Sequence, residues 1–333
     1  MDGHAPKTSI RITHRTDKSI PMSILMALIK PFGSKLVSSS KDYPPGSPRL
    51  TVPKAIQKSC SVTERKVNDI YLYDIKRPAP LVATATKKSP RRKRIYYFAG
   101  GGWHMPPSGQ HWKSCRRFAH EIPNATITIV SYPLAPHSPA PDAFPQLMKL
   151  YRTLLAQSHE DDEYVILAGD SSGGNIVLAL ALEALREEPD GLAPDALLAI
   201  CPSVDMCRDN KDMEEVERHD PLLSIDFTRA SAKGWVGDWE NCDPKASPLQ
   251  ADVEVLKRAG VRCHGLTAGY DVLSPDGILF REKCAKAGVE GEWLQWERQM
   301  HCWALAWIYG LSESRDAMRW MVDLMKREGT EEP

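Results

Sequence analysis

Residues 163–183 read EYVILAGDSSGGNIVLALALE, and this stretch decides the fold. Residues 164–168 form an apolar run of strand length, and residues 175–183 have the composition of a helix. Ser171 lies between them, in a turn where glycines leave room for the backbone to fold tightly. A serine at a sharp strand-to-helix turn has its hydroxyl lifted out of the sheet. The stretch therefore predicts an exposed, nucleophilic Ser171.

The remaining chain alternates between strand and helix patterns. This alternation predicts an α/β fold with a mostly parallel central sheet and helices on both faces. The expected strands are residues 70–75, 94–98, 125–131, 165–168, 196–201, 262–268 and 292–297, and the expected helices are residues 143–155, 175–186, 278–287 and 313–327.

Composition narrows the class of function. The 333 residues carry 43 basic and 43 acidic side chains, so no global charge favours nucleic acid as a partner. The basic run at residues 87–94 precedes an expected strand, and we favour a solvated loop over a binding patch. None of the eight cysteines has metal-site spacing, which predicts reduced thiols, no metal and a cytoplasmic location.

The N-terminal region has no strand and helix alternation and is expected to be irregular. Residues 1–4 do not begin a secretion signal. Residues 21–32 are apolar but fall short of the roughly twenty residues that cross a bilayer. We favour a helix that covers the mouth of a site, and weak contact with a membrane surface is the alternative. Homodimer formation is a separate expectation.

Two later residues fit the partners that a nucleophilic serine needs. Asp271 follows the expected strand at 262–268, and His301 follows the last expected strand. In such sheets the chain order is serine, then acid, then histidine, which matches Ser171, Asp271 and His301. Asp276 is an alternative acid, but a carboxylate in the first turn of a helix is stabilised there by the helix dipole.

A glycine loop follows the expected strand at 94–98. Backbone N–H groups of Gly101, Gly102 and Ser172 are the expected donors to an oxyanion, while a flexible glycine-rich turn is the alternative reading. Four side chains near this loop either line a substrate pocket or pack in the core: Trp103, His104, Met105 and Trp112.

These motifs resemble the hormone-sensitive-lipase branch of the α/β-hydrolases. The resemblance spans about residues 96–303 and includes YPLAP at 132–136, SPL at 247–249 and DVL at 271–273. Ala99 departs from it, because the family has a histidine that supports the glycine loop. By resemblance, residues 1–60 and 205–240 are N-terminal and inserted helical cap segments, and residues 61–204 and 241–333 are the catalytic core.

The resemblance implies a serine carboxylester hydrolase without a cofactor, acting on a small-molecule ester with a small-to-medium acyl group. It is closest in character to fungal members, which implies a deacetylase or lactone hydrolase in natural-product biosynthesis. Relatives also include small-molecule receptors that lack the histidine and tailoring enzymes that guide a cyclisation. The presence of His301 favours hydrolysis over both.

Overall fold

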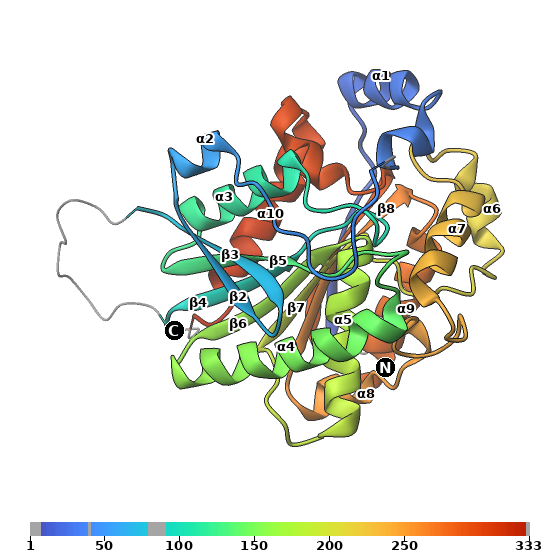
Figure 1. The fold of residues 1–333 in the computed structure, drawn as a ribbon. Coiled ribbons are helices and arrows are strands. Elements are labelled where there is room, and N and C mark those ends of the chain that lie inside the picture. The colour runs from blue at the N-terminus through green and yellow to red at the C-terminus, as the bar shows by residue number, and fades with distance from the viewer. Residues whose placement is uncertain (1–7, 39–40, 79–90, 331–333) are drawn as a thin grey trace, which may run out of the picture.

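A nine-stranded sheet forms the centre of the molecule (Figure 1). The computed structural model describes residues 8–38, 41–78 and 91–330. The sheet order is β1-β9-β8-β7-β6-β4-β5-β3-β2. The strands are β1 (Ile10–Arg15), β2 (Ser61–Val67), β3 (Ile70–Lys76), β4 (Lys93–Phe98), β5 (Ala125–Ser131), β6 (Tyr164–Asp170), β7 (Ala196–Ile200), β8 (Arg262–Tyr270) and β9 (Gly291–Met300).

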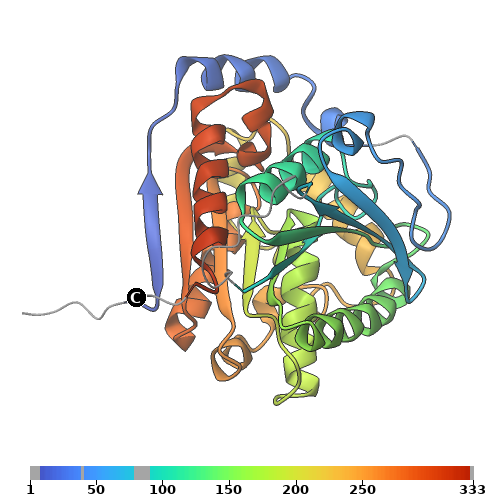
Figure 2. The ribbon, with the colours of Figure 1, turned by 90° about the vertical axis from the view of Figure 1, so that its left-hand side faces the viewer.

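The sheet is mostly parallel, as predicted. Antiparallel pairing is confined to β2 with β3 and β3 with β5. The first strand was not predicted: β1 pairs in parallel with β9, with Ile10 opposite Gly291. The N-terminal region is therefore not irregular throughout, because residues 10–15 belong to the edge of the core sheet (Figure 2).

Helices cover both faces of the sheet. Side chains alternate along β4, so that Tyr96 and Phe98 pack with the core that includes α4 and α5, while Ile95 and Tyr97 pack with α3 and α10. The longer helices are α1 (Ile20–Ile29), α3 (Gly109–Glu121), α4 (Ala140–Glu160), α5 (Ser172–Glu187), α7 (Ile225–Val236), α9 (Ser274–Ala287) and α10 (Ser312–Arg327). The short helical segments are η1 (Gly33–Val37), α2 (Lys54–Gln57), α6 (Asp212–Glu217), η2 (Pro248–Gln250), α8 (Glu254–Arg258) and η3 (Trp303–Tyr309).

The first turn of α5 packs directly on the backbone of β4. A Cβ atom added to Gly173 would lie 1.9 Å from the carbonyl oxygen of Phe98, and one added to Gly169 would lie 2.5 Å from the backbone of Gly173. Only glycine allows such an approach. The contact fixes the distance between the β6–α5 turn and the loop that follows β4.

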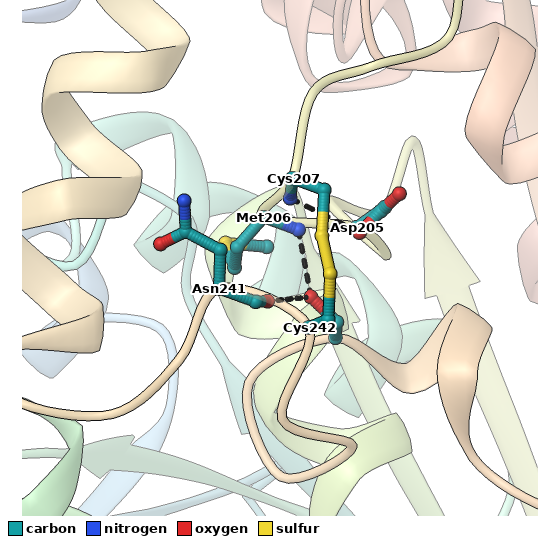
Figure 3. Close-up of a disulfide and its surroundings, with 6 residues drawn as sticks. Asp205, Met206, Cys207, Asn241 and Cys242 are labelled. Atoms are coloured by element: carbon teal, nitrogen blue, oxygen red, sulfur yellow. Dashed lines mark hydrogen bonds between the residues drawn. A yellow bond between two sulfur atoms is a disulfide. The ribbon is translucent and has the colours of Figure 1, made fainter.

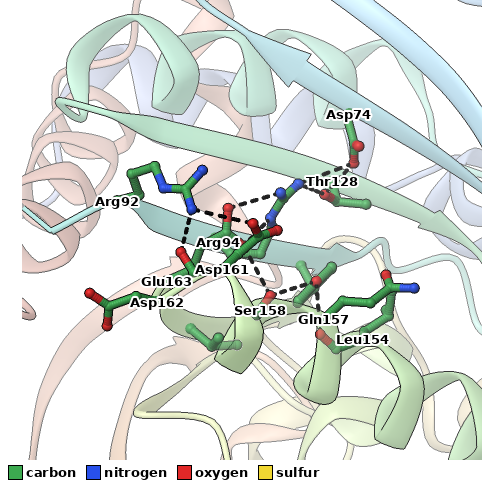
Figure 4. Close-up of polar contacts among 12 residues, drawn as sticks. Asp74, Arg92, Arg94, Thr128, Leu154, Gln157, Ser158, Asp161, Asp162 and Glu163 are labelled. Carbon is green, nitrogen blue, oxygen red and sulfur yellow. Dashed lines mark hydrogen bonds and ion pairs between the residues drawn. The ribbon is translucent and has the colours of Figure 1, made fainter.

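An ion-pair network around the buried Glu163 lies at the amino ends of the parallel strands (Figure 4). Arg94 donates two hydrogen bonds to Glu163, at 2.8 and 2.9 Å, and lies 3.5 Å from Asp74. The side chain of Lys93 is also buried. These two residues of the basic run are therefore structural, which corrects the expectation of a solvated loop for them, and residues 87–90 lie outside the described part.

Cys207 and Cys242 form a disulfide (Figure 3). It joins the loop after β7 to the loop after α7, which brackets the insertion between β7 and β8. This pair corrects the expectation that every thiol is reduced, which was the argument for a reducing compartment. The other six cysteines are free.

A helix that crosses a bilayer needs roughly twenty consecutive, mainly apolar residues. Within residues 8–38, 41–78 and 91–330, no helix combines the length and apolar character needed for a membrane span.

The contact between α5 and β4 leads to a stability prediction. Replacing Gly173 with alanine forces its new Cβ into the Phe98 carbonyl and should lower the free energy of unfolding by at least about 3 kcal/mol, since overpacking of this kind has no free space to relax into. The matched control is Gly234→Ala in α7, where a Cβ would meet nothing within 4 Å. It should stabilise by about 0.5–1 kcal/mol. Urea denaturation measures both, and equal midpoints for the two variants would contradict the packing.

Candidate active site

Ser171 occupies a strained turn between β6 and α5. Its backbone has φ 52° and ψ −117°, a region that non-glycine residues seldom adopt, and it makes no side-chain capping bond to α5. Its N–H donates to the carbonyl of Ile200 at 2.9 Å, and its own carbonyl accepts from Ser203. These bonds to the neighbouring strand end hold the turn, and they leave the hydroxyl free to face a cavity.

His301 and Asp271 are joined by a hydrogen bond of 2.8 Å between Nδ1 and Oδ2. The carboxylate can only accept, so the proton lies on Nδ1. His301 follows β9 and Asp271 follows β8, and Asp271 is completely buried. The chain thus presents Nε2 of His301 toward the cavity that Ser171 also lines. Within the described residues, no hydrogen bond joins Ser171 Oγ to Nε2, and Cys302 Sγ lies 3.4 Å from Nε2.

Electrostatics strengthen the affinity of His301 for a proton. Burial alone lowers the pKa of His301, but the charge and hydrogen bond of Asp271 outweigh it and raise the pKa to about 9. Since the ordinary value is 6.5, the resulting stabilisation of the fold is complete below pH 6.5 and is lost as the pH rises through about 9. The Asp271 carboxylate is therefore the main partner of the imidazole.

Asp170, the residue before Ser171, stabilises the glycine loop by hydrogen bonds. The Asp170 carboxylate accepts from Tyr97 Oη at 2.7 Å and lies 3.1 Å from His111 Nε2. Burial alone would raise the pKa of Asp170, but His111, Tyr97 and the N–H of Gly100 lower it. Because Asp170 binds the Gly100 N–H, the nucleophile turn and the glycine loop are tied together.

A second hydrogen bond stabilises the glycine loop at Ala99, the position where the family has a histidine. Tyr132 Oη donates to the carbonyl of Ala99 at 2.7 Å. Tyr132 belongs to the YPLAP motif, and its side chain is buried. Together with the bond from the Gly100 N–H to Asp170, this contact holds both polar groups of the peptide that joins Ala99 to Gly100. The loop at Ala99 therefore has side-chain support without a histidine.

One cavity of about 720 Å³ lies above these groups. Ser171, His301, Gly101 and Gly102 line it, and both expected cap segments contribute to its walls. The N-terminal segment contributes Leu25, Ile29, Leu36 and Val37, and the insertion contributes Phe227, Thr228 and Ser231. Figure 2 shows α1 lying across the end of the sheet toward which β1 points.

The structure divides the four expected pocket residues. Trp103 and Met105 line the cavity. Trp103 also stacks on Trp235 of α7, with ring centres 5.7 Å apart, so it connects the glycine loop to the cap. His104 packs edge-on against Phe227 and is not brought to the cavity wall. Trp112 packs against Tyr73 in the core, so ordinary packing is its observed environment.

Sequence reasoning missed the part played by Asp220. Its carboxylate accepts from Val272 N–H at 2.9 Å and from Leu222 and Leu223, which ties the insertion to the loop that carries Asp271. Burial and the charge of Asp271 raise the pKa of Asp220 to about 7. The Asp-Pro-Leu-Leu stretch at 220–223 was visible in the sequence, but nothing there showed that it lies against residue 271.

Comparisons with known proteins agree with this architecture. Residues 95–305 match the sequence profile of a family described as having an alpha/beta hydrolase fold. An esterase of Acinetobacter venetianus is 30% identical over 200 residues, which covers 59% of this chain and 62% of that protein. The putative acetyl-hydrolase LipR of Mycobacterium tuberculosis is 31% identical over 225 residues, which covers 67% of this chain and 70% of that protein.

A solved structure gives the same picture of the fold. An esterase from the bacterial hormone-sensitive lipase family superposes with a TM-score of 0.73 at 20% identity, and the match covers 95% of this chain and 100% of that one. A structural similarity at 20% sequence identity shows that the two proteins share a fold.

The bond between His301 and Asp271 leads to a titration prediction. Asp271→Asn removes the largest contribution that raises the pKa of His301, so the midpoint should fall by about 1–3 pH units, because burial then outweighs the smaller contributions of Cys201 and Asp220. NMR of the imidazole measures it. Asp276→Asn, a nearby buried carboxylate on α9 that does not contact His301, is the matched control and should leave the midpoint unchanged. An unchanged midpoint in Asp271→Asn would contradict the pairing.

Proposed function

Because this chain belongs to the family with the alpha/beta hydrolase fold, we propose that it is a serine carboxylester hydrolase. The observation that carries the proposal is the His301–Asp271 hydrogen bond at the wall of the cavity that Ser171 lines. The relatives named above are an esterase and a putative acetyl-hydrolase, which supports the same class of reaction. The chain spans only 62% of the length of the first relative, so the proposed activity of this chain rests on the geometry of its site.

In the proposed reaction, Ser171 Oγ attacks the ester carbonyl and its proton passes to His301 Nε2. Asp271 keeps the other imidazole proton on Nδ1 and stabilises the imidazolium that forms. The imidazolium then protonates the leaving alcohol, and water releases the acid from the acyl-enzyme by the same base. Hydrogen bonds between base and nucleophile are often long before substrate binds, and this step requires Nε2 and Oγ to come together.

The backbone N–H groups of Gly101, Gly102 and Ser172 are the proposed oxyanion donors. Gly101 and Gly102 line the cavity, and Ser172 begins α5, where the N–H groups of the first turn have no partner within the helix. Loss of one such donor costs about 2.7–4 kcal/mol of transition-state stabilisation. The braces on the loop at Ala99 and Gly100 keep these donors aimed before substrate arrives.

The proposal extends to the acyl group. A cavity of about 720 Å³ suits a small-to-medium ester, and the name of the mycobacterial relative supports acetyl esters as substrates. The more specific form of this proposal is removal of an acetyl group from a natural product, or opening of a lactone on one. Nitrophenyl esters from acetyl to decanoyl measure the preference.

A substitution at Ser171 tests the assignment. Ser171→Ala should lower turnover of nitrophenyl butyrate by at least about 10⁴-fold, because the nucleophile is lost while the oxyanion donors remain. A fluorophosphonate should label the unmodified protein at Ser171 and leave the variant unlabelled, which also separates an enzyme from a receptor. Thermal unfolding controls for the fold. Undiminished turnover in a folded variant would refute the mechanism.

The N-terminal segment supports a proposal about partners. Along α1 and the residues after it, one side is apolar and exposed, and the other packs on the body through Met22 and Met26. Residues 18–41 contain four lysines and no acidic residue. This combination favours an anionic lipid surface as the partner, with the cavity entrance beside it. The exposed side chains are Ile20 (76%), Ile24 (54%), Leu28 (65%), Phe32 (59%) and Leu36 (53%).

Vesicle binding tests this partner. Replacing Ile24 and Leu28 together with serine should weaken binding to vesicles that contain phosphatidylserine by about tenfold or more, since each side chain contributes well over 1 kcal/mol when buried. Turnover of a water-soluble ester should be unchanged, because neither side chain lines the cavity. Leu192→Ser, at an exposed leucine after α5, is the control for apolar loss elsewhere. Equal binding by all the proteins would contradict the proposal.

Homodimer formation is the remaining proposed partner interaction. Strand β1 lies at the edge of the sheet, and four of its six residues are exposed. An exposed edge strand offers unpaired backbone groups to a second copy.

A further inference from the structure

Two free cysteines lie beside the proposed catalytic base. Cys201 directly follows β7, and Cys302 directly follows His301 after β9. The ligand atoms of these three residues all lie within 4.8 Å of one another. We infer that Cys201, His301 and Cys302 form a binding site for a soft divalent cation such as Zn²⁺, and that the bound cation switches the enzyme off.

The spacing of the ligand atoms fits a tetrahedral cation. With Zn–S near 2.3 Å and Zn–N near 2.0–2.1 Å, two ligands of a tetrahedral site lie roughly 3.6 Å apart for sulfur and nitrogen, and roughly 3.8 Å apart for two sulfurs. Cys302 Sγ is 3.4 Å from His301 Nε2. Since every pair lies within 4.8 Å, movements of about 1 Å complete the geometry. Thiolate and imidazole are also the ligands that zinc prefers.

The Nδ1 side of the His301 imidazole makes the hydrogen bond that is typical of a metal-binding histidine. Asp271 Oδ2 accepts the Nδ1 proton of His301 at 2.8 Å, so Nε2 is the nitrogen that can bind a cation, in exchange for any proton that it carries. A carboxylate on the far nitrogen fixes the tautomer and ring orientation and raises the basicity of metal-binding histidines. The arrangement that makes His301 a base for Ser171 therefore also makes it a ligand.

The cation can reach this site through the cavity. His301 and Cys302 both line it, and Cys201 lies behind them with 2% of its surface exposed. Binding releases the two thiol protons to solvent, together with the Nε2 proton where the imidazole is protonated, and the Nε2 lone pair then binds the cation. The fourth ligand position stays open toward the cavity. Three protein ligands with one open position suffice for a zinc site.

Inhibition follows from the atom that the cation occupies, and this part rests on the proposed function. A cation on Nε2 removes the lone pair that accepts the proton of Ser171. Because the same atom serves both roles, cation and catalysis exclude one another. Ester turnover should therefore fall in proportion to occupancy of the site.

Cobalt binding tests the site without reference to activity. Co²⁺ added to the metal-free protein should give one equivalent of a thiolate-to-cobalt charge-transfer band, which Zn²⁺ then displaces. The band should be lost in Cys201→Ser and in Cys302→Ser. Cys60→Ser is the matched control, because Cys60 Sγ lies the same 3.4 Å from His120 Nε2 but has no third ligand beside it among residues 8–38, 41–78 and 91–330, and it should keep the band. A missing band, or one that persists in Cys302→Ser, would overturn the site.

Inhibition is measured against each protein's own metal-free rate. The Zn²⁺ concentration that halves turnover of a soluble ester should rise at least tenfold in Cys201→Ser and stay unchanged in Cys60→Ser. A cobalt band without inhibition would overturn the role of Nε2. A protein that binds cobalt but has no turnover even without metal would refute the proposed function and leave the metal site standing.

Discussion

The contact between the first turn of α5 and the backbone of β4 is the constraint on which the site depends. With no Cβ at residue 173, the helix approaches the Phe98 carbonyl so closely that the turn at Ser171 lies against the glycine loop. Asp170 uses this proximity, since one carboxylate binds Tyr97, His111 and the Gly100 N–H. The strained backbone of Ser171 persists because hydrogen bonds to Ile200 and Ser203, at the end of β7, hold it in place.

The cap and the core are coupled through the same few residues. Trp103, at the end of the glycine loop, stacks on Trp235 of α7. Asp220, in the insertion, accepts a hydrogen bond from the N–H of Val272 in the loop that contains Asp271. Movement of the insertion would therefore reach both the proposed oxyanion donors and Asp271, which binds His301. The N-terminal segment adds the opposite wall, with Leu25 and Ile29 facing the cavity while Ile24 and Leu28 face outward.

Sequence patterns predicted what is local or follows a fixed chain order. Four features each follow a strand of the sheet: Ser171, the glycine loop, Asp271 and His301. The carboxyl ends of parallel strands meet at one edge of a sheet. Pairings between distant segments gave no local signal: β1 with β9, Cys207 with Cys242, and Asp220 with Val272. Trp112 shows another limit. It lies on the buried face of α3, a helix that was not among those expected from the sequence, so its packing in the core could not be predicted.

The absence of metal-site spacing in the sequence illustrates why such rules miss sites assembled by a fold. His301 and Cys302 are adjacent, and the third ligand comes from a strand end about a hundred residues earlier. A catalytic base needs an available lone pair, an oriented ring and access from a cavity, and a metal ligand needs the same three properties. Thiols placed beside such a base therefore create a competing ligand set, so the proposed activation of Ser171 and the proposed control by soft cations depend on the same nitrogen atom of His301.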